Sequence, residues 1–133
     1  MERGLVTNER NGDIKVFEGS RTVNWLQTPE STGGQYCSVC TCTYEPGKRA
    51  YPAHSHPAGE ETIYVVSGSG KVKIGDEIFP LETGSLALFP QGVPHMVWNN
   101  GDVPLKLCCF YAPNQDAIGY EWHEDFDFPE FKK

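Results

Sequence analysis

The sequence predicts an all-β domain, built as a sandwich or a barrel of short strands. Two observations predict this fold class. The 133 residues include 14 Gly and 10 Pro, and these turn formers separate short apolar or alternating runs. No segment before residue 113 keeps the 3.6-residue period of an amphipathic helix over three turns. A sandwich or a barrel covers or closes its sheet edges, which a single open sheet of so many short strands does not.

The first strands are expected on either side of turn sequences. The turn at 11–13 predicts strands at 5–7 and 14–17. A loop rich in Thr and Gly follows at 28–34, and a strand is expected at 35–44.

The second half of the chain contains shorter strands with sharper turns. Their β-branched and alternating residues, cut by Gly, Pro and Asn, predict strands at 62–66, 71–74, 77–81, 85–89, 95–98 and 104–112. By the alternation of side chains along a strand, Ile63 is expected inside and Tyr64 outside. Leu86, Leu88 and Phe89 are expected in the core.

The chain length fits one domain, at residues 1–133. We expect a barrel at about 14–112 and a C-terminal extension at 113–133. The extension is acidic and aromatic, with Tyr120, Trp122, Phe126, Phe128 and Phe131. It is expected to pack on the barrel or on a neighbouring subunit, and a short helix within it is only weakly indicated.

Charge and hydropathy exclude several kinds of partner. The 11 basic and 18 acidic residues give a net charge of −7, and no Lys/Arg cluster is present to bind nucleic acid or an anionic membrane surface. No run approaches the 18 or so apolar residues of a transmembrane helix. The start reaches polar Thr7 and Asn8 without the apolar region of a secretory signal, so a cytoplasmic location is expected.

The five cysteines are odd in number, so a disulfide framework is not expected. Cys37 and Cys40 have CxxC spacing, but Cys108 and Cys109 are adjacent and distant, unlike a second zinc knuckle. We expect buried or half-buried strand thiols, with a second metal site as the alternative.

Three of the four histidines indicate chemistry. His54 and His56 are two residues apart, so in a strand both imidazoles point to one face. Glu61 follows, and His95 lies far downstream. Three imidazoles and one carboxylate suit a divalent transition metal. Four protein ligands leave two positions of an octahedron open, as catalysis requires.

The residues around this set resemble the two signatures of the cupin superfamily. Residues 47–68 contain the Gly, His-x-His, Glu and Gly of the first signature, G-x5-H-x-H-x3,4-E-x6-G. Residues 84–99 match the second, G-x5-P-x-G-x2-H-x3-N, at every fixed position. One departure is a first gap of six residues instead of five, for which a small bulge before the histidines is expected.

The resemblance to a small single-domain, Cupin_2-like protein implies an antiparallel jelly-roll barrel, the double-stranded β-helix, with a metal inside its mouth. It implies His54, His56, Glu61 and His95 as ligands of Fe, Mn, Zn, Ni or Co. Glu60 is adjacent to Glu61, but the six-residue spacing to the next signature glycine selects Glu61.

The function that this implies is a metalloenzyme acting on a small oxygenated molecule, such as a hydroxy or oxo acid, an enediol or a sugar-like compound. We favour dioxygenase chemistry over isomerase, decarboxylase or lyase chemistry. The alternative function is a non-catalytic binding or sensor protein.

The side chains that could reach the barrel mouth are Tyr51, Tyr111, Tyr120 and Trp122, with Lys48 and Arg49 as the nearest basic groups. His123 is expected at the surface. A homodimer is expected through residues 1–30 and the tail.

Overall fold

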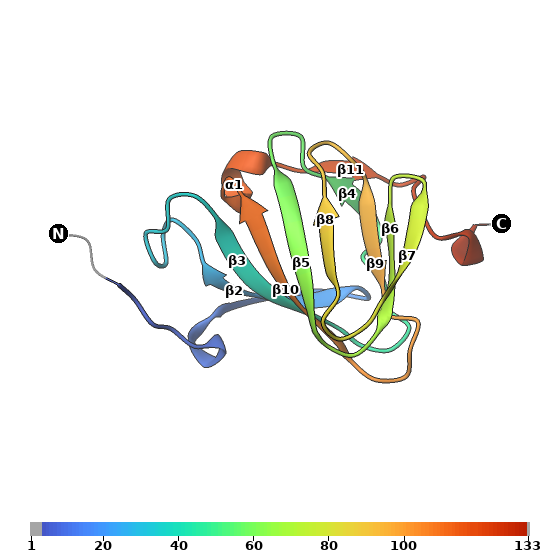
Figure 1. Ribbon diagram of the computed structural model, residues 1–133, viewed down its shortest axis with the longest axis horizontal. Coiled ribbons are helices and arrows are strands. Elements are labelled where there is room, and N and C mark those ends of the chain that lie inside the picture. Colours follow the sequence, from blue (N-terminus) through green and yellow to red (C-terminus); the bar gives the residue numbers. More distant parts are fainter. Residues whose placement is uncertain (1–3, 133) are drawn as a thin grey trace.

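The computed structural model describes residues 4–132 and contains two antiparallel sheets (Figure 1). The first sheet has the order β1 (Asp13–Phe17), β2 (Arg21–Gln27), β3 (Ser38–Tyr44), β10 (Leu105–Ala112), β5 (Glu60–Ser67) and β8 (Leu86–Phe89). The second has the order β11 (Glu121–His123), β4 (Ala53–Ser55), β9 (His95–Trp98), β6 (Gly70–Ile74) and β7 (Glu77–Leu81). Helical turns are confined to η1 (Glu9–Asn11), α1 (Gln115–Ile118) and η2 (Pro129–Phe131) in the described chain. The all-β prediction is confirmed.

The two sheets enclose one core. Along each strand, side chains that point into the core alternate with side chains that point out. The inward side chains are less than 5% exposed and include Val23, Cys40, Cys42, Ile63, Val65, Val72, Val97, Leu105, Leu107 and Cys109. Ile63 faces this core, whereas Tyr64 is 43% exposed, so both parity predictions are confirmed. Since the core lies between the sheets, inward side chains from both reach the same interior space.

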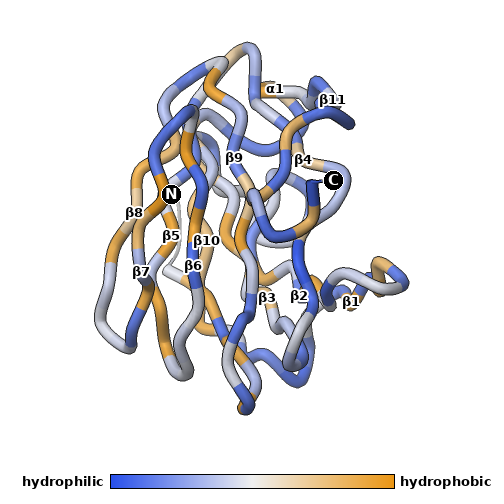
Figure 2. The backbone as a smooth tube through the Cα atoms, turned by 90° about the vertical axis from the view of Figure 1, so that its right-hand side faces the viewer, coloured by the Kyte–Doolittle hydropathy of each residue, from blue (hydrophilic) through white to orange (hydrophobic). Residues whose placement is uncertain are grey.

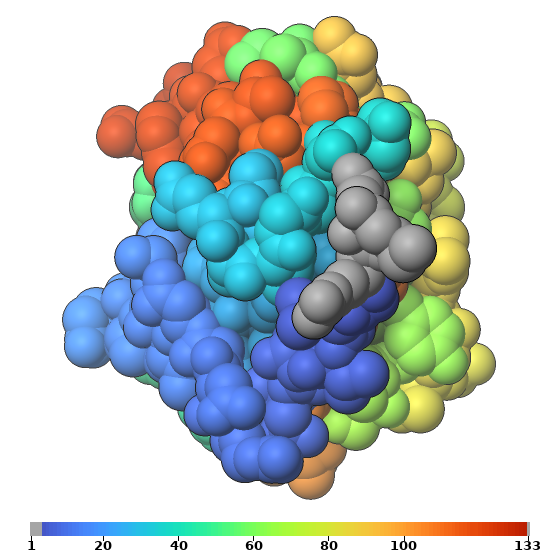
Figure 3. Space-filling view, turned by 90° about the vertical axis from the view of Figure 1, so that its left-hand side faces the viewer, coloured from blue at the N-terminus to red at the C-terminus, as the bar shows by residue number. Residues whose placement is uncertain are grey.

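The prediction for the N-terminal strands is wrong in one place. Residues 5–7 form no strand, and β1 instead forms a hairpin with β2, pairing Asp13 with Trp25. The Asn8 side chain accepts a hydrogen bond from the Arg10 amide, which turns the chain into η1 before β1 begins. Leu5 therefore lies over the outside of the barrel, where it lines a groove with Leu26 and residues 32–34. Figure 3 shows this face, with the N-terminal segment in dark blue beside the lighter blue chain that follows it.

The core prediction is wrong for two leucines of β8. Leu86 and Leu88 are 66% and 47% exposed, whereas Phe89 is buried. The pairing of β8 with β5 explains this difference, because Phe89 lies opposite inward Glu61 and Leu86 lies opposite outward Tyr64. The hydropathy colouring of Figure 2 shows apolar residues along β5, β8 and β10, so apolar character alone does not identify the inner face.

The C-terminal segment packs on its own barrel. Strand β11 pairs with β4, so the second sheet continues beyond residue 112. Further on, the Phe128 ring is fully buried and lies 5.2 Å from the Trp98 ring on the outer face of β9. Asp127 accepts two hydrogen bonds from the Arg49 guanidinium, at 2.9 and 2.8 Å. In the part of the chain described, no helix has the length and apolar character needed to cross a membrane.

Asn99 of the second signature and Gly68 of the first each lie in a connection between strands. The Asn99 side chain donates to the carbonyls of Tyr44 and Val103 and accepts from the Gly101 amide, so it holds the turn after β9. Gly68 has a φ of +88°, a conformation that favours glycine, and it lies against the backbone of Pro104.

Candidate metal centre

Both sheets contribute to one cluster of imidazole and carboxylate groups. His54 on β4 pairs directly with His95 on β9, and His56 follows β4. Glu61 comes from β5 in the opposite sheet. One ligand atom of each of these four residues lies within 4.8 Å of all the others, and no member is more than 6% exposed. The fold therefore brings together the four residues predicted from the sequence, whereas Glu60 is exposed.

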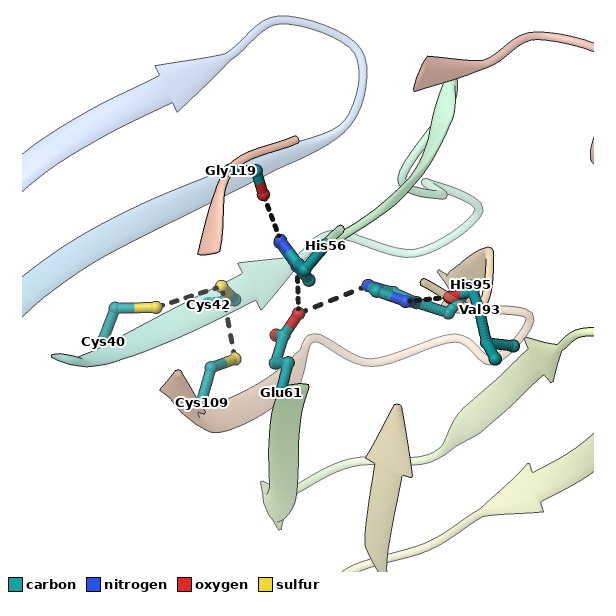
Figure 4. A network of polar contacts seen from close by, with 8 residues as sticks. All are labelled: Cys40, Cys42, His56, Glu61, Val93, His95, Cys109 and Gly119. Atoms are coloured by element: carbon teal, nitrogen blue, oxygen red, sulfur yellow. Dashed lines mark hydrogen bonds and ion pairs between the residues drawn. The ribbon is translucent and has the colours of Figure 1, made fainter. Parts of the chain in front are cut away.

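The hydrogen bonds of the ring nitrogens orient two imidazoles toward Glu61 (Figure 4). His56 Nδ1 lies 2.8 Å from the Gly119 carbonyl, and His95 Nδ1 lies 3.2 Å from the Val93 carbonyl. Because a carbonyl only accepts, each Nδ1 is the protonated nitrogen that donates. The Nε2 atoms then face Glu61 Oε1 with their lone pairs, at 3.1 Å for His56 and 3.3 Å for His95. A cation between these converging acceptors, either a proton or a metal ion, would stabilise the arrangement.

The donor set fits a divalent transition metal. His54 Nδ1 and His95 Nε2 are buried without a hydrogen-bond partner, which is costly unless another group binds them. Three imidazoles with a carboxylate suit Fe, Mn, Co, Ni or Zn. The Nδ1 bonds to backbone carbonyls also match the outer contacts that usually orient metal-binding histidines. A cavity of about 20 Å³ among these side chains has room for an ion or one water.

Burial and neighbouring charge keep these groups in the forms that bind metal. Burial of the His54 ring, assisted by His95, lowers its pKa to about 2, so the ring stays neutral near pH 7. Burial would raise the pKa of Glu61, but hydrogen bonds that a protonated His56 or His95 ring donates from Nε2, together with the charge of that ring, outweigh this effect and lower it. A neutral imidazole and an ionised carboxylate are the ligating forms.

Aromatic rings surround the cluster. Phe89 stacks on His95 with ring centroids 4.0 Å apart, and Tyr111 lies 5.4 Å from the His56 ring. Tyr120 lies 4.9 Å from the same ring. Burial raises the pKa of both tyrosines, so their phenols remain protonated and able to donate hydrogen bonds.

The other aromatic candidates divide between the site and the surface. Trp122 lies 5.6 Å from the His54 ring, and this indole is 55% exposed. Tyr51 points elsewhere and donates to the Glu124 carbonyl. His123 is outside the cluster, with its Nε2 2.8 Å from Ser55 Oγ.

The sequence indicates Lys48 and Arg49 as the basic residues nearest the barrel mouth, but a different basic residue lies inside the barrel. Arg21, at the start of β2, lines the same cavity as His54 and Glu61. Arg49 instead binds Asp127, and Lys48 is exposed. The sequence signal for Arg21 is the alternation of residues 21, 23 and 25, which places Arg21 on the inward face with Val23. Sequence reasoning misses this signal because it does not recognise the strand at 21–27.

Comparisons with known proteins show which chains and folds this protein resembles. Protein SchB of Streptomyces halstedii is 33% identical over 104 residues, which cover 78% of this chain and 68% of SchB. Polyketide synthase CurC of Streptomyces cyaneus is 30% identical over 105 residues, covering 76% of this chain and 68% of CurC. A Klebsiella pneumoniae protein described as an uncharacterized conserved protein with a double-stranded beta-helix domain superposes with a TM-score of 0.74 at 20% identity, covering 92% of this chain and all of that one.

The family assignment follows from a family model whose matched residues include the whole His/Glu cluster. The model of the cupin domain matches residues 40–111, more than half of the chain, and this range includes all four members of the His/Glu cluster. The protein belongs to the cupin family.

Proposed function

We propose that this protein is a metal-dependent enzyme that acts on a small oxygenated molecule. The observation that carries the proposal is the convergence of His56 Nε2 and His95 Nε2 on Glu61 Oε1 inside a buried cluster. The similarity to CurC, a protein named as a polyketide synthase, supports an enzymatic role. The proposed substrate class includes diketones and enols of polyketide type, together with hydroxy acids, oxo acids and enediols.

The residues of the chain would hold the metal and shape access to it. His54, His56, Glu61 and His95 would ligate the ion and leave positions free for a chelating substrate. When bound, the ion supplies Lewis acidity for isomerase, decarboxylase or lyase chemistry, or, as iron, the dioxygenase chemistry that we favour.

Other side chains supply the polar and charged surroundings of the substrate. The protonated phenols of Tyr111 and Tyr120 would donate hydrogen bonds to its oxygen atoms. Arg21 contributes a positive charge to the cavity, which favours an anionic substrate or product.

The narrow interior supports one alternative function. A cavity of about 20 Å³ holds an ion but no organic substrate, so catalysis needs the substrate to enter from the side of Tyr120 and Trp122. Both are partly exposed, at 42% and 55%. If this side does not admit a substrate, the protein is a metal-binding or sensor cupin without catalysis.

The proposal is tested first by metal content. The protein is purified without added metal, analysed by elemental mass spectrometry, and then reloaded with each divalent ion after chelation. We expect about one ion per chain in the wild type and a loss of at least tenfold in affinity for His95→Ala. His123→Ala is the matched control and keeps full metal content, because His123 lies outside the cluster.

Catalysis is tested with the loaded protein. Oxygen uptake and substrate loss are followed with enediols, diketones and hydroxy acids. Turnover that requires the bound ion and is lost in His95→Ala supports the enzyme. Metal binding without turnover on this panel, with ligand-dependent thermal stabilisation instead, supports the sensor. A wild-type protein that rebinds no divalent ion overturns both.

We also propose that the protein is a homodimer that pairs through its N-terminal region. Strand β1 is a sheet edge, and Ile14 and Val16 on it are 61% and 62% exposed. The tail is less available, because it covers its own barrel. Sedimentation equilibrium is expected to give twice the chain mass, and Val16→Lys is expected to weaken the dimer. A wild-type monomer at micromolar concentration would contradict the proposal.

A further inference from the structure

A second cluster of metal-binding side chains lies in the barrel beside the His/Glu cluster. Cys40 and Cys42 are two residues apart on β3, so both thiols point inward. Cys109 on β10 lies opposite Cys40 in the register of the two strands. The three thiols are free and buried, with exposed fractions of 0%, 4% and 1%. Figure 4 shows them grouped around Cys42, to one side of Glu61.

The sulfur atoms are spaced as ligands of one ion. Cys42 Sγ lies 3.7 Å from Cys109 Sγ and 3.9 Å from Cys40 Sγ, and all three atoms lie within 4.8 Å of one another. Metal–thiolate bonds of about 2.3 Å imply sulfur separations of about 3.8 Å in a tetrahedral site and about 4.0 Å in a trigonal one. A metal ion can therefore bind all three sulfur atoms after only small side-chain movements.

The chemistry of the cluster selects a soft ion. The described residues place no fourth His, Cys or carboxylate ligand atom in this group, whereas structural zinc normally takes four protein ligands. Thiolates prefer Cu(I) among the common first-row ions. Cu(I) also tolerates three-coordinate thiolate binding, so the three sulfur atoms suffice.

The surroundings moderate the charge that such a site would bury. Arg21 lines the same cavity as Cys42 and Cys109, and its guanidinium is a permanent positive charge. Hydrogen bonds from the Cys109 and Cys40 thiols hold the pKa of Cys42 well below its usual value, although burial opposes this effect, whereas the pKa values of Cys40 and Cys109 are raised. Three thiolates and one Cu(I) carry two negative charges, of which Arg21 offsets one.

We propose that Cys40, Cys42 and Cys109 form a second, sulfur-only site for Cu(I), separate from the His/Glu cluster. Binding forms three Cu–S bonds and releases one proton to solvent for each of the three thiols that is still protonated, without any change in oxidation state. The inference stands on the sulfur geometry alone and does not depend on the proposed enzyme activity.

The test uses reduced, metal-free full-length protein under anaerobic conditions. Cu(I) is titrated in competition with a chromophoric Cu(I) chelator, and the copper-loaded protein is examined by X-ray absorption spectroscopy. We expect one tightly held Cu(I) per chain with about three sulfur neighbours near 2.3 Å. Copper surrounded by nitrogen and oxygen alone would overturn the proposal, because it would place the ion in the His/Glu cluster.

Cysteine variants locate the ion. Cys42→Ser is expected to lower Cu(I) affinity at least tenfold and to reduce the number of sulfur neighbours. Cys108→Ser is the matched control, since Cys108 is next to Cys109 but half-buried and outside the cluster. Equal Cu(I) affinity and sulfur coordination in both variants would contradict the proposal. If Cys42→Ser does not fold, the wild-type X-ray absorption spectrum decides the outcome.

Discussion

The pairing of Arg49 with Asp127 is expected to be the main polar attachment of the C-terminal segment. Arg49 Nε and Nη2 donate to the two carboxylate oxygens at 2.9 and 2.8 Å, a bidentate contact. Asp127 Oδ1 also accepts from the Phe128 amide. Asp127→Ala removes all three bonds and leaves the Arg49 guanidinium without this partner.

The magnitude follows from how far the pair is buried. The side chains of Arg49 and Asp127 are 23% and 9% exposed. Breaking a fully buried pair costs about 3–5 kcal/mol, whereas exposed pairs contribute about 0–1 kcal/mol. A mostly buried pair lies between these limits, so Asp127→Ala is expected to lower the free energy of unfolding by about 2–3 kcal/mol.

The assay is urea unfolding of metal-free protein, with Glu130→Ala as the matched control from the same segment. Glu130 lies 3.6 Å from Lys71, and their side chains are 47% and 37% exposed, so its loss is expected to cost no more than about 0.5 kcal/mol. The reasoning is refuted if the two variants have the same free energy of unfolding. A double-mutant cycle with Arg49→Ala would then show whether the pair contributes any coupling energy.

Three further predictions follow from the site and its supports. Glu61→Gln is expected to reduce metal affinity at least tenfold, and Glu60→Gln to leave it unchanged; isothermal titration with equal affinities would contradict the assignment. Burial lowers the folded-state pKa of His54 to about 2, so from pH 6.5 downward only the unfolded chain takes up that proton. Stability of the metal-free protein should thus fall with decreasing pH, by up to about 1.4 kcal/mol per unit from His54, and urea unfolding of His54→Gln should show a shallower slope. Gly59→Ala would place a Cβ 2.6 Å from the Ala112 carbonyl oxygen of β10, so it is expected to lower the free energy of unfolding by about 1–3 kcal/mol and to lower the melting temperature. Gly4→Ala is the control and should change the melting temperature little, because the space around Gly4 is open.

The metal cluster is accessible to sequence reasoning because its members lie in two short motifs that resemble the cupin signatures. His54 and His56 are two residues apart, and the turns that present Glu61 and His95 are marked by glycine and proline. Spacing does not reveal the orientation of each imidazole, because that orientation depends on carbonyls from distant segments, such as Gly119 for His56.

The errors in the fold have physical reasons. Leu86 and Leu88 are apolar, but the face of a strand is set by its pairing, and the partner strand places them opposite outward residues. Arg21 escapes sequence reasoning because the strand at 21–27 is not recognised, so its alternation with Val23 and Trp25 is not used. The sulfur cluster requires the register of β3 with β10, which joins residues far apart in the chain.

The hydrogen bond from His56 Nδ1 to the Gly119 carbonyl links a ligand to the C-terminal segment. Binding of an ion at His56 Nε2 and docking of this segment therefore act on one ring, and if ion binding favours docking, thermodynamic reciprocity makes docking favour ion binding to the same degree. Occupancy of the site would then be reported at a distance, as slower hydrogen exchange of the β11 amides that pair with β4.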